Sequence, residues 1–244
     1  MILTIDIGNT RIKCAVFEDY TLLEIKIFSR IDLILNIQNI LKKNPEISNL
    51  IVSSVRNATE NDFFELKNQV NIIFVDQKTI FPFKNLYTTP ATLGIDRMVL
   101  SAGAVIQFPE KNRLVIDAGT CVTYDYINAK NQYLGGAIAP GLRLRYESLH
   151  NYTANLPLLT TEKPENQIGN STSQAIHSGI VNGLVHEIDG FVNQFISENS
   201  NFIIILTGGD SEFLAKRLKN TIFANSNFLL ESLNQLYHYT NQND

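Results

Sequence analysis

The sequence has little of what marks several large classes of protein. It contains two cysteines and four histidines, and no apolar run approaches the length that spans a membrane. The chain begins in a strand-like segment, without the basic and apolar regions of a signal peptide. We therefore expect a soluble cytoplasmic protein. Its only cysteines, Cys14 and Cys121, follow two predicted turns and are expected to act as small buried apolar residues.

Several familiar catalytic motifs are also missing. There is no Gly-x-x-x-x-Gly-Lys-Ser/Thr, which excludes the P-loop class, and no Gly-x-Gly-x-x-Gly follows a strand to support a dinucleotide site. His186-Glu187 lacks the second histidine of a zinc-protease helix, and no Gly-x-Ser-x-Gly elbow of a hydrolase is present. A net charge of −4 with dispersed basic residues gives no positive field, so no nucleic-acid partner is expected.

The most informative stretch is a predicted hairpin close to the start of the chain. Apolar strands at residues 2–5 and 14–17 flank eight residues, which are Asp6, Ile7, Gly8, Asn9, Thr10, Arg11, Ile12 and Lys13. Gly8 allows close backbone approach, so that N–H groups, the Thr10 hydroxyl and the Lys13 ammonium can bind phosphate. Asp6 fits such a site if a divalent cation lies between carboxylate and phosphate. The stretch is either a Mg-nucleotide phosphate site or an ordinary Asn/Gly turn with an exposed acid and base.

A similar segment recurs near the middle of the chain. Asp117-Ala118-Gly119-Thr120 lies between an apolar strand at 114–116 and another at 121–125. A repeat at half the chain length suggests two similar lobes facing each other across a cleft. A third turn, Gly208-Gly209, follows an apolar strand at 202–206 and precedes a helix. This ordered set resembles the sugar kinase, Hsp70 and actin superfamily, in which the hairpins hold phosphates and the late glycines let adenosine approach the backbone.

The remaining pattern predicts an α/β protein. With 44% hydrophobic and 18% charged residues, the chain can bury a substantial core. Strands at 22–28, 50–52 and 72–75 and helical segments at 31–41 and 62–66 indicate a mixed sheet covered by helices. Later helices are expected from 142 onward, over 173–197, 213–218 and 228–239, with a loop at 81–92. With the resemblance, we expect two actin/Hsp70-like (ribonuclease H-like) lobes, residues 1–111 and 112–244, each a mixed sheet with flanking helices, and an ATP cleft between them.

Another polar block, Gly94-Ile95-Asp96-Arg97, precedes a predicted buried helix at 98–106. An acid at a helix N-terminus is favoured by the helix dipole, so Asp96 could simply be a cap. Arg97 has the opposite preference, which a salt bridge or a bound anion has to compensate. Thr172, at the start of the long helix at 173–197, is likewise a plausible cap residue.

In their order, these blocks closely resemble the type III pantothenate kinases. The resemblance runs from Ile2 to about Gly209, and the Gly-x-Asp-Arg block separates this family from its superfamily relatives. It also includes Thr172 and a glycine-rich segment, Gly135-Gly136-x-Ile138-x-Pro140-Gly141-Leu142. One departure is Asn170, where the family pattern has a basic residue.

The resemblance implies ATP-dependent phosphorylation of the primary hydroxyl of pantothenate to 4'-phosphopantothenate, the first step of coenzyme A biosynthesis. It also implies a homodimer with the pantothenate pocket near the dimer interface. ATP would contact residues 6–13 and Thr120, with Asp6 on the Mg²⁺ side, and Asp117 would hold a monovalent cation, K⁺ or NH₄⁺. Asp96 would accept the proton. The implied substrate-binding residues are Tyr87, Gly94, Ile95, Asp96, Arg97 and Thr172.

Two other functions are compatible with parts of the pattern. The first is another kinase of the superfamily that acts on a sugar or small alcohol, which only the block at residues 94–97 argues against. The second is a catalytically idle relative that binds nucleotide and regulates transcription through a partner. Such a relative would be expected to lose chemistry residues, whereas all of them are retained here: Asp6, Lys13, Asp96, Arg97, Asp117 and Thr120.

Overall fold

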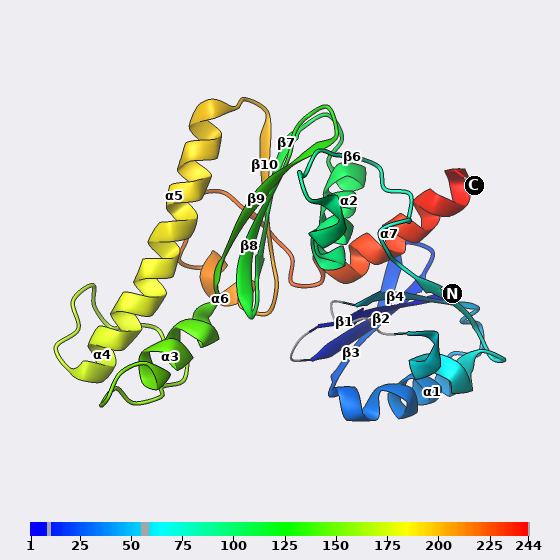
Figure 1. Ribbon diagram of the computed structural model, residues 1–244, viewed down its shortest axis with the longest axis horizontal. Helices are drawn as coiled ribbons and strands as arrows, with labels where there is room; N and C mark the ends of the chain where they lie inside the picture. The colour runs from blue at the N-terminus through cyan, green and yellow to red at the C-terminus, as the bar shows by residue number, and fades with distance from the viewer. Residues whose placement is uncertain (9–10, 55–58, 244) are drawn as a thin grey trace. The chain divides into compact units, whose positions relative to one another are not determined.

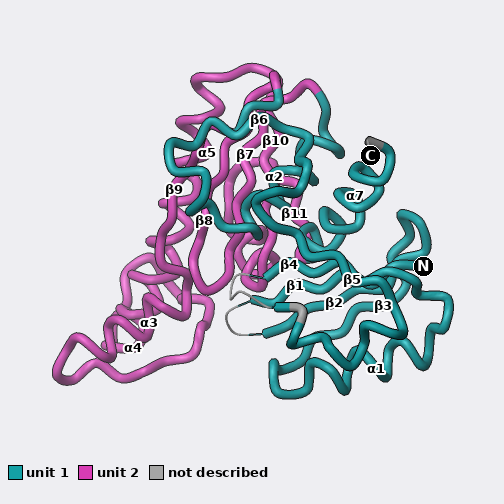
Figure 2. Tube along the Cα trace, turned by 45° about the vertical axis from the view of Figure 1, so that its right-hand side comes forward, with its two compact units in different colours: residues 1–109, 131–133, 227–244 teal, residues 110–130, 134–226 magenta. Residues whose placement is uncertain are grey.

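The computed structural model describes residues 1–8, 11–54 and 59–243, and the chain divides into two compact units. Unit 1 comprises residues 1–109, 131–133 and 227–244, and unit 2 comprises residues 110–130 and 134–226. Figure 2 shows them in teal and magenta. Each unit is built on a mixed β-sheet with helices packed against it (Figure 1). The predicted fold class is therefore confirmed.

Unit 1 contains a five-stranded sheet in the order β3-β2-β1-β4-β5. β1 pairs antiparallel with β2 and parallel with β4. The strands are β1 (Ile2–Ile7), β2 (Ile12–Glu18), β3 (Thr21–Phe28), β4 (Asn49–Ser54) and β5 (Asn71–Phe74). The helices are α1 (Leu33–Lys43), α2 (Ile95–Gln107) and α7 (Phe228–Asn243), with 3₁₀ turns at Arg30–Asp32, Glu60–Leu66 and Pro90–Thr92.

The core of unit 1 lies on both faces of this sheet. Side chains alternate along a strand, so successive residues of β1 reach opposite faces. Leu3 and Ile5 are buried in a cluster with Ile37 and Ile40 of α1. Ile2, on the other face, is buried in a second cluster contributed by β4, α2 and α7. Because both faces are covered by apolar side chains, β1 is fixed in register and its polar end is held in place.

Unit 2 repeats the strand order of unit 1. Its sheet has the order β11-β10-β7-β8-β9-β6, so β9-β8-β7-β10-β11 corresponds to β3-β2-β1-β4-β5. The strands are β7 (Asn112–Ala118), β8 (Cys121–Ile127), β9 (Gln132–Pro140), β10 (Phe202–Thr207) and β11 (Phe223–Ala224). The edge strand β6 (Lys84–Asn85) pairs with Gln132 and Tyr133, which are grouped with unit 1. The internal repeat noticed in the sequence is thus a repeat of topology.

The helices of unit 2 are α3 (Leu142–Asn151), α4 (Thr172–His177), α5 (Gly183–Glu198) and α6 (Ser211–Ala215). The sequence predicted one helix over 173–197, but α4 and α5 are joined by a π-helical segment, Ser178–Asn182. Here the Ser178 hydroxyl donates to the Gln167 carbonyl, and the Asn182 side chain donates to the Ser178 hydroxyl. Such side-chain bonds compete with the regular helical pattern.

The last helix, α7, belongs to unit 1, whereas the sequence analysis placed it in the second lobe. Leu233 and Leu236 of α7 are buried in one cluster with Val99 and Ala102 of α2. The two helices approach closely at Gly103, where an added Cβ would lie 1.9 Å from the hydroxyl oxygen of Ser232. The chain therefore enters unit 2 at residue 110 and returns to unit 1 at residue 227.

Candidate active site

The first predicted phosphate turn connects β1 and β2 in unit 1. Asp6 lies opposite Lys13 on β2 and beside Ser53 on β4. Paired residues share a face of the sheet, so the carboxylate, the ammonium and the Ser53 hydroxyl point to the same side. The Gly8 N–H donates to the Arg11 carbonyl at 3.2 Å, which closes the turn.

Of the eight predicted ATP-binding residues here, Asn9 and Thr10 lie outside the described residues. Ile7 and Ile12 are buried in the core, so they anchor the turn through their side chains.

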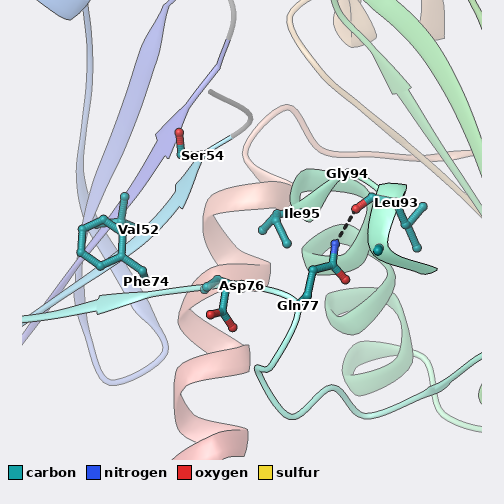
Figure 3. A pocket seen from close by; sticks show the side chains of 10 residues that line it. Val52, Ser54, Phe74, Asp76, Gln77, Leu93, Gly94 and Ile95 are labelled. Carbon is teal, nitrogen blue, oxygen red and sulfur yellow. Dashed lines mark hydrogen bonds between the residues drawn. The ribbon is translucent and has the colours of Figure 1, made fainter. Parts of the chain in front are cut away.

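Unit 1 also contains a cavity of about 390 Å³, within the size range of small-molecule sites. It is lined by the ends of β4 and β5 and by the segment before α2 (Figure 3). The lining residues are Val52, Ser54, Phe74, Val75, Asp76, Gln77, Ala91, Leu93, Gly94 and Ile95. The Gln77 side-chain amide donates to the Leu93 carbonyl at 2.8 Å. This bond links the segment after β5 to the segment before α2. Two predicted substrate residues, Gly94 and Ile95, therefore line this cavity.

Sequence reasoning missed the polar residues of this cavity. Asp76 and Gln77 follow the end of β5, and Ser54 ends β4. β4 and β5 are parallel neighbours. The carboxyl ends of parallel strands are a recurrent place for ligands, so polar residues directly after two such strands were the signal available.

Asp96 lies in the first turn of α2. The helix begins at Ile95 with Gly94 as its N-cap, and the Asp96 carboxylate accepts a hydrogen bond from the Arg97 N–H at 2.9 Å. A Cβ at residue 94 would lie 2.4 Å from the same carboxylate oxygen, so this conformation requires a residue without a side chain. Burial raises the pKa of Asp96, against the lowering effect of the Arg97 N–H and charge. A fixed carboxylate with a raised pKa is a stronger general base than an exposed one.

In the described part of unit 1, Asp96 and Arg97 directly follow two lining residues but are not themselves part of the cavity lining. The last two predicted substrate residues, Tyr87 and Thr172, lie elsewhere. Tyr87 follows β6, donates its N–H to the Asn85 side chain at 2.9 Å and places its ring edge-on to Tyr133. It is absent from the cavity lining in the described part of unit 1. Thr172 is the exposed first residue of α4 in unit 2. The N-cap of α4 is Ser171, whose hydroxyl accepts from the Gln174 N–H, so the interpretation of Thr172 as the cap is wrong.

The second predicted phosphate turn connects β7 and β8 in unit 2. Asp117 lies beside Thr123 on β8 and Thr207 on β10. The Gly119 N–H donates to the Cys121 carbonyl at 2.9 Å, which closes a shorter turn than that of unit 1. Thr120 is exposed at its tip. Hydroxyl and carboxylate oxygens around one point are donors suited to a hard cation.

Two glycines let neighbouring turns pack onto this one. A Cβ at Gly141, the N-cap of α3, would lie 2.1 Å from the Gly119 carbonyl oxygen. Gly208, after β10, has a φ of +95°, and a Cβ there would lie 2.4 Å from an Asp117 carboxylate oxygen. The Asp210 N–H completes the contact by donating to the Ala118 carbonyl at 3.0 Å. The start of α3 thus packs on Gly119 and Thr120 of the β7–β8 turn, and the Gly-Gly turn packs on Asp117 and Ala118.

Cys121 corrects one expectation from the sequence. Cys14 is buried on β2 as predicted, but Cys121 is exposed. It is the first residue of β8, next to the exposed Thr120, where the strand has not yet entered the core. Burial raises the pKa of the Cys14 thiol to about 12. Of the two cysteines, only Cys121 is therefore placed to react with a reagent dissolved in the solvent.

Within residues 1–8, 11–54 and 59–243, no group of three His, Cys, Asp or Glu side chains is arranged to hold a metal ion. A divalent cation at Asp6 would therefore need further oxygen ligands from a bound phosphate or water. In the same part of the chain, no helix is both long and apolar enough to cross a bilayer.

Solved structures define the class of fold. A ROK family glucokinase from Streptomyces griseus, solved with glucose and AMPPNP, superposes with a TM-score of 0.54 at 11% identity, over 99% of each chain. A protein from Campylobacter jejuni, proposed to be a Baf family transcriptional activator, superposes with a TM-score of 0.61 at 21% identity, over 99% of this chain and 100% of that chain. At such identities the likeness shows the fold alone, which this chain shares with that glucokinase.

Sequence comparisons define the family within this class. The model of the type III pantothenate kinase family matches residues 2–194. A type III pantothenate kinase from Flavobacterium johnsoniae is 63% identical over the full length of both chains. Another from Flavobacterium psychrophilum is 60% identical over 98% of this chain and 99% of the relative. The chain belongs to the type III pantothenate kinase family, as the order of its motifs indicated.

Proposed function

We propose that this protein transfers the γ-phosphoryl group of ATP to the primary hydroxyl of pantothenate, giving 4'-phosphopantothenate and ADP, as the first step of coenzyme A biosynthesis. The observation that carries the proposal is the full-length match to a type III pantothenate kinase at 63% identity. The fixed carboxylate at the start of α2 and the neighbouring cavity give that activity a physical basis.

We assign pantothenate to the cavity of unit 1 and the proton to Asp96. The hydroxyl oxygen forms a bond to the γ-phosphorus, the bond between that phosphorus and the β–γ bridging oxygen breaks, and the hydroxyl proton passes to Asp96. Gly94 and Ile95 line the cavity. Arg97, beside Asp96, is suited to the substrate carboxylate. Tyr87 and Thr172 are included on the family resemblance.

We assign the ATP phosphates to the β1–β2 turn and to Thr120. Asp6 and Lys13 share a face of the sheet, which suits one to a cation and the other to phosphate oxygens. Asn9 and Thr10 are assigned to the same turn by the family resemblance. Mg²⁺, when bound with ATP, neutralises charge on the phosphates. Positioning and charge neutralisation by backbone N–H groups and Lys13 then supply most of the rate enhancement.

We assign the monovalent cation, K⁺ or NH₄⁺, to Asp117. The residues present fit such an ion, because the strand neighbours of this carboxylate on both sides are threonines, and the Ala118 carbonyl oxygen and an Asp117 carboxylate oxygen both lie close to Gly208. A cation there would lessen repulsion between the carboxylate and nearby phosphates. The family resemblance further supports a homodimer and a cytoplasmic location. Light scattering of the purified protein would test the dimer.

The first experiment is to measure ADP release by the purified protein with Mg-ATP, with and without pantothenate and K⁺. Turnover that requires both is the expected result. Turnover with other alcohols in place of pantothenate would instead identify a different kinase of the superfamily. ATP binding without turnover on any alcohol would favour a catalytically idle relative, and a substrate panel separates these outcomes.

A further inference from the structure

A half-buried ion pair joins two helices of unit 2. A terminal guanidinium nitrogen of Arg145, on α3, lies 2.6 Å from a carboxylate oxygen of Glu187, on α5. The other oxygen of Glu187 accepts a hydrogen bond from the Tyr124 hydroxyl of β8 at 3.1 Å. Burial and the charge of Glu187 raise the pKa of Tyr124, so this hydroxyl stays protonated and remains a donor. Three elements are therefore tied together at one carboxylate.

The same arginine is connected to the β7–β8 turn by a continuous series of hydrogen bonds. Its Nε donates to the Pro140 carbonyl at 2.8 Å, immediately before the first turn of α3. The next residue, Gly141, donates its N–H to the Thr120 carbonyl at 3.0 Å. Because an added Cβ at Gly141 would overlap the Gly119 and Thr120 carbonyl oxygens, the start of α3 and the turn are in direct contact. A displacement of α3 would therefore displace Thr120.

We propose that Arg145 is a positioning residue for ATP binding, which holds the start of α3, and through it Thr120, in place by pairing with Glu187. This inference rests on the proposed function, in which Thr120 contacts ATP. Arg145 does not touch the reacting atoms in this proposal. It acts because a guanidinium can bond Glu187 and Pro140 at once through separate nitrogens, which an ammonium at the end of a lysine does less readily.

A second arginine on the same helix provides a matched control. Arg143 forms an ion pair with Glu147, four residues further along α3, at 2.7 Å. Its side chain is 72% exposed, against 20% for Arg145. Removing Arg143 therefore also removes an arginine–glutamate pair from α3 but breaks no bond to the turn.

The kinetic test compares Arg145→Ala and Glu187→Gln with Arg143→Ala. We expect the first two to raise the KM for ATP by about ten-fold or more, because a small displacement of a substrate-positioning group is costly. The KM for pantothenate should change much less, and Arg143→Ala should change neither. Glu187→Gln keeps the side-chain volume and an acceptor for Tyr124, so it tests the pairing even if Arg145→Ala folds poorly. Equal changes in both KM values, or no change, would overturn the proposal.

A second readout does not depend on catalysis. Cys121 is exposed and adjoins Thr120, so its rate of alkylation by iodoacetamide reports on the turn. Arg145→Ala should change this rate relative to the parent and to Arg143→Ala, because the surroundings of the exposed thiol change when the turn moves. If the protein did not phosphorylate pantothenate but the alkylation rates differed in this way, the proposed function would fail while the positioning role stood. Unchanged alkylation rates in Arg145→Ala would contradict the role of Arg145 itself.

Discussion

The two units place an aspartate at the same point of the same topology and surround it with different chemistry. Asp6 is the next-to-last residue of β1, and Asp117 is the next-to-last residue of β7, the corresponding strand of unit 2. The residue opposite Asp6 is Lys13, whereas the residue opposite Asp117 is Thr123. A lysine beside a carboxylate suits a phosphate that carries a metal ion with it. A threonine beside a carboxylate suits a cation that binds without a phosphate. Under the proposed function, one backbone arrangement serves two ionic tasks, and we propose that the cross-strand neighbour distinguishes them.

The turns themselves also differ. The β7–β8 turn is contacted by Gly141 and Gly208, which leave no space for a side chain. Unit 1 carries instead the cavity and the Asp96 block. We therefore expect changes at the cavity and the Asp96 block of unit 1 to act mainly on pantothenate and on the chemical step. Changes in the β1–β2 turn should act on Mg-ATP, and changes in the turns of unit 2 should act on ATP and on the monovalent cation.

The largest effect is expected from Asp96→Asn. The amide cannot accept the hydroxyl proton, so kcat should fall by about a thousand-fold or more while ATP still binds. Turnover assays measure the loss of kcat in this variant, and titration with ATP measures whether it still binds the nucleotide. Full activity in Asp96→Asn would remove this residue as the base.

Gly208→Ala tests the close packing around Asp117. A positive φ and a Cβ 2.3 Å from the Ala118 carbonyl oxygen should destabilise the protein by about 2 kcal/mol. Gly209→Ala is the matched control, because a Cβ there meets nothing within 4 Å. Thermal unfolding of the two variants should differ clearly, and equal midpoints would show that the packing at Gly208 can relax.

Asp117→Asn and Asp6→Asn separate the two ionic tasks. We expect Asp117→Asn to weaken the response to K⁺ by about ten-fold or more, whereas Asp6→Asn should raise the KM for Mg-ATP and leave the K⁺ response intact. K⁺ titrations at saturating ATP measure the difference. The assignment of the cation to Asp117 would be wrong if Asp117→Asn kept the parent's K⁺ dependence.

The pH dependence should report the environment of Asp96. As pH falls through its pKa this carboxylate becomes protonated and can no longer accept a proton, so kcat declines on the acid side. Because burial raises the pKa, the midpoint should lie above that of an ordinary aspartate. A profile of kcat against pH, with protein stability checked at each point, tests the direction of this shift.

The smallest expected effect concerns the two cysteines. Iodoacetamide at neutral pH should modify Cys121 and spare Cys14, since Cys14 is buried with its pKa raised to about 12. Mg-ATP should slow the modification of Cys121 if ATP contacts the adjacent Thr120. Mass spectrometry of the labelled peptides measures both, and equal labelling with and without ATP would separate Cys121 from the nucleotide site.

The elements that the sequence predicted well are those with a local signature. Short apolar runs identified the strands, and the polar blocks identified where they end. The tie between Arg145 and Glu187 joins residues 42 positions apart, and no local pattern marks it. The interruption at Ser178–Asn182 depends on a bond to the carbonyl of Gln167, in the preceding loop. The cavity in unit 1 likewise combines residues from three separate segments, so its lining followed only from the tertiary structure.

The return of α7 to unit 1 has a consequence for synthesis on the ribosome. The buried cluster that joins β1, β4 and α2 is incomplete until Leu233 and Leu236 have been made. Unit 2 is encoded wholly between the two parts of unit 1, apart from residues 131–133. Unit 1 is thus the first unit whose translation begins and the last whose translation is completed. Its nascent form exposes an apolar surface while unit 2 is being translated. Loss of α7 should therefore damage the N-terminal half of the protein more than the segment that directly precedes the deletion.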